Sequence, residues 1–205
     1  MKNNNNILLL VLLTLLITGC TTSPPSQTSD VCEIFREKKG WYRAAAKAED
    51  KYGTGIHTMM AFMHQESRFV ANARPPRKKY LGFIPGPRPS NAYGYAQAKT
   101  ETWREYQRAT GNYRHKRDRF RDAAMFIGWY NDLSNRRNNI PKYDTYRLYL
   151  AYHEGHGGYS RGSYRQKPWL EPVARRVADQ GWRYRVQLDE CEKELKRRRR
   201  FLWIF

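Results

Sequence analysis

The 205-residue sequence predicts one principal domain of the all-α class. Several segments repeat apolar residues every three or four positions, which is the period of a helix face packed on a core. Glycines stand where such segments stop, as at Gly53, Gly111 and Gly155, and glycine commonly ends a helix because it accepts left-handed backbone geometry. No segment alternates apolar and polar residues long enough to predict a strand.

The periodic segments predict helices over residues 33–52, 55–67, 100–110, 118–136, 144–154 and 171–196. Thr54 is the expected N-cap of the second helix, because a threonine hydroxyl accepts a backbone N–H of the first turn. The last segment forms one helix or two, with Gly181 as the expected point of a break.

Residues 74–89, RPPRKKYLGFIPGPRP, contain five prolines and two glycines, which exclude a regular helix. A long ordered loop beside a functional site is often a lid or a wall for the substrate. Alternatively, Tyr80, Phe83 and Ile84 would form a short β-ribbon packed on the body, or would pin the loop to it. The sequence leaves these interpretations open.

The N-terminus has the features of an exported lipoprotein. The apolar run from Ile7 to Ile17 is too short for a membrane span and is typical of a signal peptide. It leads into Leu-Ile-Thr-Gly-Cys20, which resembles the lipobox of bacterial lipoproteins. The resemblance implies a signal peptide over 1–19, cleavage before Cys20, lipidation of its thiol and a polar tether over 20–31. Secretion without a lipid is the alternative.

These features predict a periplasmic protein held on a membrane through Cys20, since several acyl chains on one cysteine anchor far better than one. The outer membrane is favoured over the inner one, because Thr21 stands where inner-membrane retention is often marked by aspartate. The folded domain is expected over 32–196, with a basic and aromatic tail over 197–205. The tail either lies on an anionic membrane surface or is disordered beyond the last helix.

Cys32 and Cys191 are the remaining cysteines, an even pair in an oxidising compartment. A disulfide between them would join the first helix to the last, and by loop closure it would stabilise the fold by about 4–5 kcal/mol. Two unpaired thiols are the alternative.

The formal net charge of the chain is +19, and it falls to +18 when Lys2 leaves with the signal peptide. In an exported protein this charge indicates acidic envelope partners, such as lipid head groups and peptidoglycan carboxylates, and no nucleic acid. A solvated basic surface without a specific partner is the alternative.

Four short motifs follow one another along the chain. They are Glu66-Ser67 at the end of an apolar helix, Tyr93-Gly-Tyr-Ala-Gln97, Asp122-Ala-Ala-Met-Phe-Ile-Gly-Trp-Tyr130 and Ala151-Tyr-His-Glu-Gly155. In this order they resemble the soluble lytic transglycosylase (SLT) family over residues 44–159. The resemblance implies a lysozyme-like fold, with the proline-rich segment as a loop or ribbon beside the cleft, and cleavage of peptidoglycan glycan strands.

The sequence departs from the family pattern at Tyr95-Ala96, at His153-Glu154 and in the proline-rich insertion. None of these changes removes the glutamate or the glutamine of the family signature. The His-Glu change puts in doubt the contacts that the family makes through an asparagine there.

Glu66 is the expected catalytic residue. Helical spacing puts it beside Met63 and Met59, and apolar neighbours raise the pKa of a carboxyl because its charged form loses water. The resemblance implies that this one carboxyl acts first as acid and then as base. The C6 hydroxyl of the cleaved sugar then closes onto C1 and leaves a 1,6-anhydro end without water.

By the same resemblance, Ser67, Gln97 and Tyr152 bind the substrate or hold Glu66. A helix-end hydroxyl, a loop cap and a core tyrosine are their respective structural alternatives. Glu154 is either a second carboxylate that permits hydrolysis or the partner of an arginine.

His153 and His156 are three residues apart around a glycine, whereas metalloprotease helices place their histidines four apart, so we expect no metal and no cofactor. The alternatives to a transglycosylase are a hydrolytic muramidase and a non-catalytic peptidoglycan-binding lipoprotein. An envelope-machinery partner, as for a wall opener in a secretion or conjugation apparatus, is a question that the residues leave open.

Overall fold

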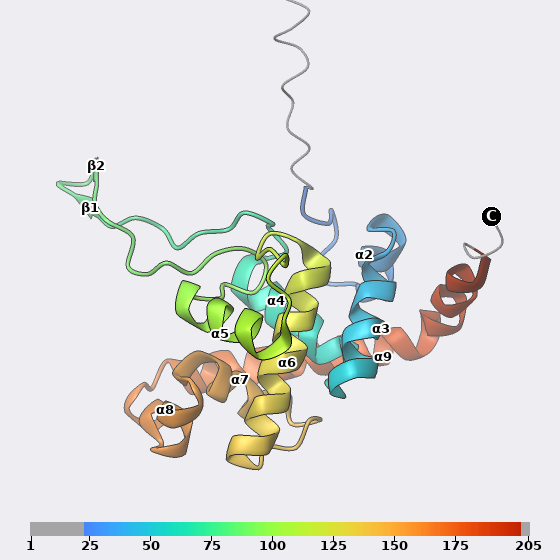
Figure 1. Ribbon diagram of the computed structural model, residues 1–205. Coiled ribbons are helices and arrows are strands. Elements are labelled where there is room, and N and C mark those ends of the chain that lie inside the picture. Colours follow the sequence, from blue (N-terminus) through green and yellow to red (C-terminus); the bar gives the residue numbers. More distant parts are fainter. Residues whose placement is uncertain (1–22, 202–205) are drawn as a thin grey trace, which may run out of the picture.

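The computed structural model describes residues 23–201 and, for side chains, residues up to 197. The all-α prediction is confirmed, because helices carry the fold and the described strands have two residues each (Figure 1). The helices are α2 Val31–Glu37, α3 Trp41–Tyr52, α4 Ile56–Ser67, α5 Thr100–Thr110, α6 Phe120–Asn138, α7 Thr145–Glu154, α8 His156–Ser160, the 3-10 turn η1 Ser163–Gln166 and α9 Leu170–Phe201. The strands are β1 Lys79–Tyr80 and β2 Ile84–Pro85.

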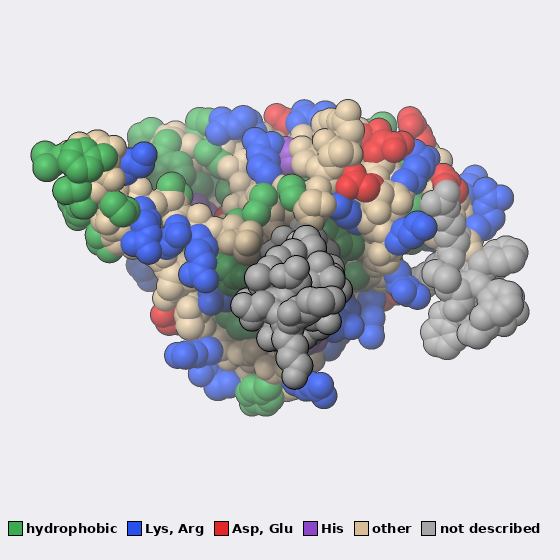
Figure 2. Space-filling model, turned by 90° about the horizontal axis from the view of Figure 1, so that it is seen from above, with side chains coloured by type: hydrophobic (Ala, Val, Ile, Leu, Met, Phe, Trp, Pro, Cys, Tyr) green, Lys and Arg blue, Asp and Glu red, His purple; other side chains and the backbone are tan. Residues whose placement is uncertain are grey.

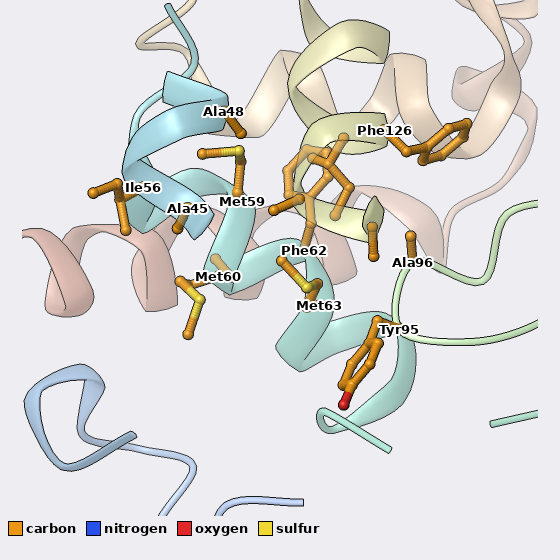
Figure 3. Packing of buried hydrophobic residues seen from close by; sticks show 14 of the residues in the cluster. Ala45, Ala48, Ile56, Met59, Met60, Phe62, Met63, Tyr95, Ala96 and Phe126 are labelled. Atoms are coloured by element: carbon orange, nitrogen blue, oxygen red, sulfur yellow. The ribbon is translucent and has the colours of Figure 1, made fainter. Parts of the chain in front are cut away.

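Helix α4 lies at the centre of the core and packs against α3, α6 and α9. Every residue from Thr58 to Met63 is buried, so the helix is enclosed on all sides and does not have the single apolar face that the sequence suggested. Figure 3 shows Met59, Phe62 and Met63 of this helix pointing into a cluster that Phe126 of α6 also joins. The rigid centre of the domain therefore ends at Glu66.

The last helix, α9, runs from Leu170 to Phe201 without a break at Gly181, so the single helix is found of the two alternatives that the sequence left open. A Cβ atom at Gly181 would lie 3.3 Å from Cγ2 of Thr145 and 3.7 Å from Cβ of Ala61. The glycine thus allows α9 to pass close to α7 and α4, and it is a packing residue.

The prediction of one continuous helix over 33–52 is wrong. The chain forms two helices there, α2 and α3, with Gly40 between them at φ +92°. Thr54 is not the N-cap of α4, whose N-cap position is Gly55. The Thr54 hydroxyl is buried without a hydrogen-bond partner. Helix α6 begins and ends two residues later than expected, and α9 ends at Phe201, five residues beyond the expected end at 196. The boundaries of α4, α5 and α7 agree to within one residue.

A disulfide joins Cys32 of α2 to Cys191 of α9, with 6.1 Å between their Cα atoms. The expected pairing is confirmed. The bond links residues 159 positions apart and ties the N-terminal helix to the long C-terminal one.

Residues 23–30, expected as part of a polar tether, lie against the body. Pro25 is buried, the backbone N–H and the hydroxyl of Ser26 each donate to Glu37 at 2.8 Å, and the Tyr184 hydroxyl donates to the carbonyl of Thr28. This part of the expected tether therefore belongs to the fold. The signal peptide and Cys20 lie outside the described residues.

The proline-rich segment forms an antiparallel β-ribbon in which Lys79 pairs with Pro85 and Tyr80 with Ile84. The expected ribbon is thus found, but it is not packed on the body: the side chains of both strands are exposed. Figure 1 shows the ribbon at the end of a long arm that leaves the helices near α5.

At the C-terminus, the basic block that begins at Lys196 continues α9, so helix and expected tail overlap up to Phe201. The apolar end of the expected tail, 202–205, lies outside the described residues. Between residues 23 and 201, no helix is both long and apolar enough to cross a membrane.

The disulfide generates a stability prediction. Cys191→Ser should lower the free energy of unfolding by up to about 4–5 kcal/mol, because the long loop is no longer closed in the unfolded chain. Urea denaturation monitored by circular dichroism measures the change. A reducing agent should lower the midpoint of the parent to that of the variant and leave the variant unchanged. Equal midpoints for the oxidised parent and the variant would contradict the prediction.

Candidate active site

A cleft of about 550 Å³ opens beside the C-terminal end of α4, between the loop that precedes α5 and the helices α6 and α7. Its lining includes Glu66, Gln97, Tyr152 and Glu154, so the structure brings together four of the residues singled out from the sequence. Pro75, at the base of the β-ribbon arm, also lines the cleft. The arm therefore contributes to a wall of the cleft by its base.

Glu66 stands in the last turn of α4, just before Arg68 ends the helix in the left-handed conformation. The Tyr149 hydroxyl of α7 donates a hydrogen bond to Oε1 of Glu66 at 2.9 Å. Burial raises the pKa of Glu66 to about 7, and this effect outweighs the Tyr149 hydrogen bond, which stabilises the carboxylate and acts in the opposite direction. The expected rise in the pKa of Glu66 is found.

Aromatic rings supply part of this enclosure. Phe62, one helical turn before Glu66, meets Tyr149 edge to face at 5.2 Å and Tyr152 at 5.1 Å between ring centroids. Tyr152 in turn packs edge to face on Tyr130 at 5.1 Å. These rings form a continuous aromatic group between α4, α6 and α7 at the end of α4 where Glu66 is buried.

Ser67 is buried, and its hydroxyl lies within hydrogen-bond distance of two backbone carbonyls, 3.1 Å from that of Met63 and 2.8 Å from that of Tyr95. Its hydrogen is therefore used inside the protein and is not directed at the Glu66 carboxyl or at a sugar. The hydroxyl fastens the end of α4 to the loop that carries Gln97.

Gln97 lines the cleft and braces its own loop. Its Nε2 donates to the carbonyl of Ala73 at 3.0 Å and to that of Gly94 at 2.9 Å, so both amide hydrogens are occupied. Its φ of +44° is a strained value for a residue with a side chain. The group that it can offer to a ligand is the amide oxygen, Oε1.

The glycine of this loop motif is also required by its position. Gly94 has φ +79°, and a Cβ atom there would lie 2.1 Å from the carbonyl oxygen of Arg117. The backbone of the loop and the segment that leads into α6 thus approach so closely that only glycine fits at this position.

Tyr152 lies in the wall of the cleft, but its hydroxyl does not bond Glu66. It donates to the carbonyl of Ala96 at 2.6 Å, and the expected hydrogen bond to Glu66 comes from Tyr149 instead. We did not single out Tyr149 from the sequence. Its position in the sequence could have indicated this role, because Tyr149 stands three residues before Tyr152 and both tyrosines therefore lie on one face of α7.

Glu154 is nearly enclosed, with 3 % of its side chain exposed. It accepts hydrogen bonds from Lys167 at 2.6 Å and from the Ser163 hydroxyl, and it lies 3.0 Å from Nδ1 of His153. Burial alone would raise its pKa, but these partners prevail and lower the pKa to about 2. The expected ion pair is present, although the partner is a lysine and not an arginine.

The two histidines of the fourth motif go to different partners. His153 lies against Glu154, whereas His156 stacks on Tyr130 at 4.3 Å and lies 3.1 Å from the Ser134 hydroxyl. Among the described residues there is no group of three or more His, Cys, Asp and Glu side chains placed to hold a metal ion.

The chain matches the transglycosylase SLT domain over residues 8–191, and it therefore belongs to this family. No curated protein and no solved structure matches the chain. Family membership agrees with the helical, lysozyme-like fold, and it supports peptidoglycan binding and lytic transglycosylase activity in general.

The pKa of Glu66 generates a prediction about stability. With an ordinary pKa of 4.5 in the unfolded chain and about 7 in the fold, the protonated carboxyl is favoured by folding. The parent therefore loses stability as the pH rises from about 4.5 to about 7, by up to about 3 kcal/mol. Glu66→Gln lacks this loss, so it should become progressively more stable than the parent over that interval. Urea denaturation at a series of pH values measures the difference.

Glu190→Gln, on an exposed position of α9, is the control for the loss of a carboxylate in general. Tyr149→Phe removes a hydrogen bond that stabilises the Glu66 carboxylate, so it should move the upper end of the interval to higher pH. A constant difference between Glu66→Gln and the parent from pH 4 to pH 8 would show that Glu66 titrates as an ordinary carboxyl.

Proposed function

We propose that the protein is a lytic transglycosylase that cleaves the β-1,4 bond between N-acetylmuramic acid and N-acetylglucosamine, with Glu66 as the single acid and base. The observation that carries the proposal is the Glu66 carboxyl, which lines the cleft and has a pKa of about 7. A carboxyl with this pKa is about half protonated at neutral pH. It can therefore donate a proton in one step and accept one in the next.

In the first step, protonated Glu66 gives its proton to the oxygen that bridges the two sugars. The bond between C1 of the muramic acid unit and this oxygen breaks, and positive charge develops at C1 and the ring oxygen. The N-acetyl group of the same sugar stabilises that charge. The Tyr149 hydroxyl, already bonded to Oε1 at 2.9 Å, stabilises the Glu66 carboxylate that is left behind.

In the second step, the Glu66 carboxylate takes the proton of the C6 hydroxyl of the same sugar, and O6 forms a bond to C1. The product is a 1,6-anhydro end, Glu66 is protonated again, and no water is consumed. Because the nucleophile belongs to the sugar already bound, little orientational entropy is lost in the attack.

The neighbouring residues would position the glycan strand. Oε1 of Gln97 can accept a hydrogen bond from a sugar hydroxyl or an acetamide N–H, since Nε2 is held by the loop. Tyr152 and Tyr130 present aromatic surface to the cleft, which suits the apolar faces of sugar rings. Ser67 contributes by holding the loop of Gln97 against α4.

The state of Glu154 favours transglycosylation over hydrolysis. A hydrolytic muramidase in the same cleft would need a second carboxylate to activate water. Glu154 lines the cleft, but with its partners Lys167, Ser163 and His153 and a pKa of about 2 it is a weak proton acceptor. We therefore propose that Glu154 has a structural role in the wall of the cleft.

Digestion of purified cell-wall sacculi tests the proposed reaction. The mature protein should release muropeptides with anhydro ends, and Glu66→Gln should release at least a thousandfold fewer, because the amide can neither give nor take the proton. Mass spectrometry of the released fragments separates the outcomes. Reducing ends would show that the enzyme is a muramidase. Binding to sacculi without release by the parent would favour a non-catalytic peptidoglycan-binding protein.

For localisation we propose a periplasmic lipoprotein, anchored through acyl chains on Cys20 and placed by preference in the outer membrane. The proposal is supported by the apolar run 7–17 and by the sequence Leu-Ile-Thr-Gly-Cys20-Thr21. Its partners are then peptidoglycan strands and the membrane that holds the lipid.

Cys20→Ser tests the anchor. It should abolish incorporation of labelled palmitate and move the protein from the membrane fraction to the periplasmic or the uncleaved precursor fraction, because the thiol is the site of acylation. Thr22→Ser, which changes a residue close to Cys20 and keeps every cysteine, is the control and should keep the label. Unchanged labelling of Cys20→Ser would contradict the proposed anchor.

A further inference from the structure

The tip of the β-ribbon arm is an exposed apolar feature, within residues 23–201, that the proposed function does not use. Its four large side chains are exposed to 55 %, 82 %, 74 % and 44 % of their surface; they are Tyr80, Leu81, Phe83 and Ile84. Isolated exposed apolar residues are common, but a contiguous group at the end of a projecting arm indicates an interaction site. None of the four lines the cleft.

The arm is built as a defined structure. Gly86 donates its N–H to the carbonyl of Lys78 at 2.7 Å, and the Arg77 guanidinium donates to the carbonyl of Gly86 at 3.2 Å. The Arg88 guanidinium reaches across to the carbonyl of Pro75. These hydrogen bonds hold the two sides of the arm together, so that the apolar turn is exposed at its tip.

All charged residues on the two sides of this tip are basic. Residues 74–89 carry five cations, Arg74, Arg77, Lys78, Lys79 and Arg88, and no aspartate or glutamate occurs from residue 67 to residue 100. Figure 2 shows hydrophobic side chains gathered at the end of the arm and Lys and Arg side chains between it and the body. Acidic side chains gather at the opposite end of this view.

We propose that the arm is a membrane-contacting hairpin, which inserts its tip, residues 80–84, into the interfacial region of an anionic phospholipid surface. Apolar side chains at the tip enter the boundary between head groups and acyl chains, and the lysines and arginines behind them stay at the level of the lipid phosphates. Each basic residue near such a surface adds favourable electrostatic energy.

The position of the arm agrees with this partner. In Figure 1 the ribbon and the first described residues lie on the same side of the body, opposite α8. The hydroxyl of Ser23, three positions after the proposed lipid on Cys20, already accepts a hydrogen bond from Lys38 of the body at 3.4 Å. This part of the argument rests on the proposed lipidation. An acyl anchor and the hairpin would then meet one membrane.

A second copy of the chain is a poorer partner for the tip. Two ribbons of two residues per strand offer little area, and each chain brings a net charge of about +18, so that two basic arms repel one another. An anionic lipid surface has the opposite charge and accepts apolar side chains without a matching shape.

Vesicle partitioning of the lipid-free form tests the hairpin separately from the anchor and from catalysis. The form that begins at Thr21 keeps every described element and the disulfide. Leu81→Ser with Phe83→Ser removes apolar surface at the tip and leaves the net charge unchanged. It should bind vesicles of equal parts phosphatidylglycerol and phosphatidylcholine at least tenfold more weakly than the parent.

The matched control is Tyr143→Ser with Trp182→Ser, which removes two aromatic side chains that are 80 % and 63 % exposed outside the arm and should bind like the parent. All forms carry the same C-terminal residues, so any contribution of those residues is equal. Sacculus digestion by the tip variant should be unchanged, which distinguishes failure of the hairpin from failure of the proposed enzyme.

Equal vesicle binding by the parent and the tip variant would overturn the proposal. So would a dimer of the parent, seen by analytical ultracentrifugation, that the tip variant loses, because the tip would then be covered by a second copy. Loss of binding by the control as strongly as by the tip variant would also overturn it, since binding would not depend on the arm.

Discussion

The proposed chemistry depends on one constraint, the removal of water from the Glu66 carboxyl. The fold provides it by ending the most deeply buried helix, α4, at the edge of the cleft. Phe62, Tyr149 and Tyr152 close the space beside the carboxyl, and burial raises its pKa to about 7. A single group can then serve as acid and base, because the same environment keeps both of its protonation states accessible.

The surrounding hydrogen bonds serve to hold the loop opposite this carboxyl. Ser67 bonds the carbonyl of Tyr95, and Tyr152 bonds that of Ala96. Gln97 donates one amide hydrogen to the carbonyl of Ala73 and the other to that of Gly94 in the same loop. The side chains expected to touch a sugar thus use much of their hydrogen-bonding capacity on the backbone. In the proposed mechanism they would act on the substrate chiefly by fixing the shape of the cleft.

Much of this could be predicted from the sequence, because helix periodicity, glycine stops and motif order are local signals. The helical class and a glutamate with a raised pKa followed from them. The pairing of Cys32 with Cys191 was predicted from the even number of cysteines left in an exported chain. What could not be predicted depends on packing between distant segments. One example is the continuity of α9 at Gly181, where the side chain of Thr145 lies close to the helix. Another is the identity of Tyr149 as the hydrogen-bond donor to Glu66. N-cap preference alone also gave the wrong role for Thr54, because its side chain is buried in the core and does not cap α4.

The docking of residues 23–30 onto the body has a consequence for the reach of the protein. A free chain of ten residues after Cys20 would span up to about 35 Å, whereas three residues span about 10 Å. With a lipid on Cys20, the cleft would have a fixed working radius, and only glycan strands in a thin layer next to the membrane would enter it. The hydrogen bonds of Ser26 and Thr28 would then determine which part of the wall is cut.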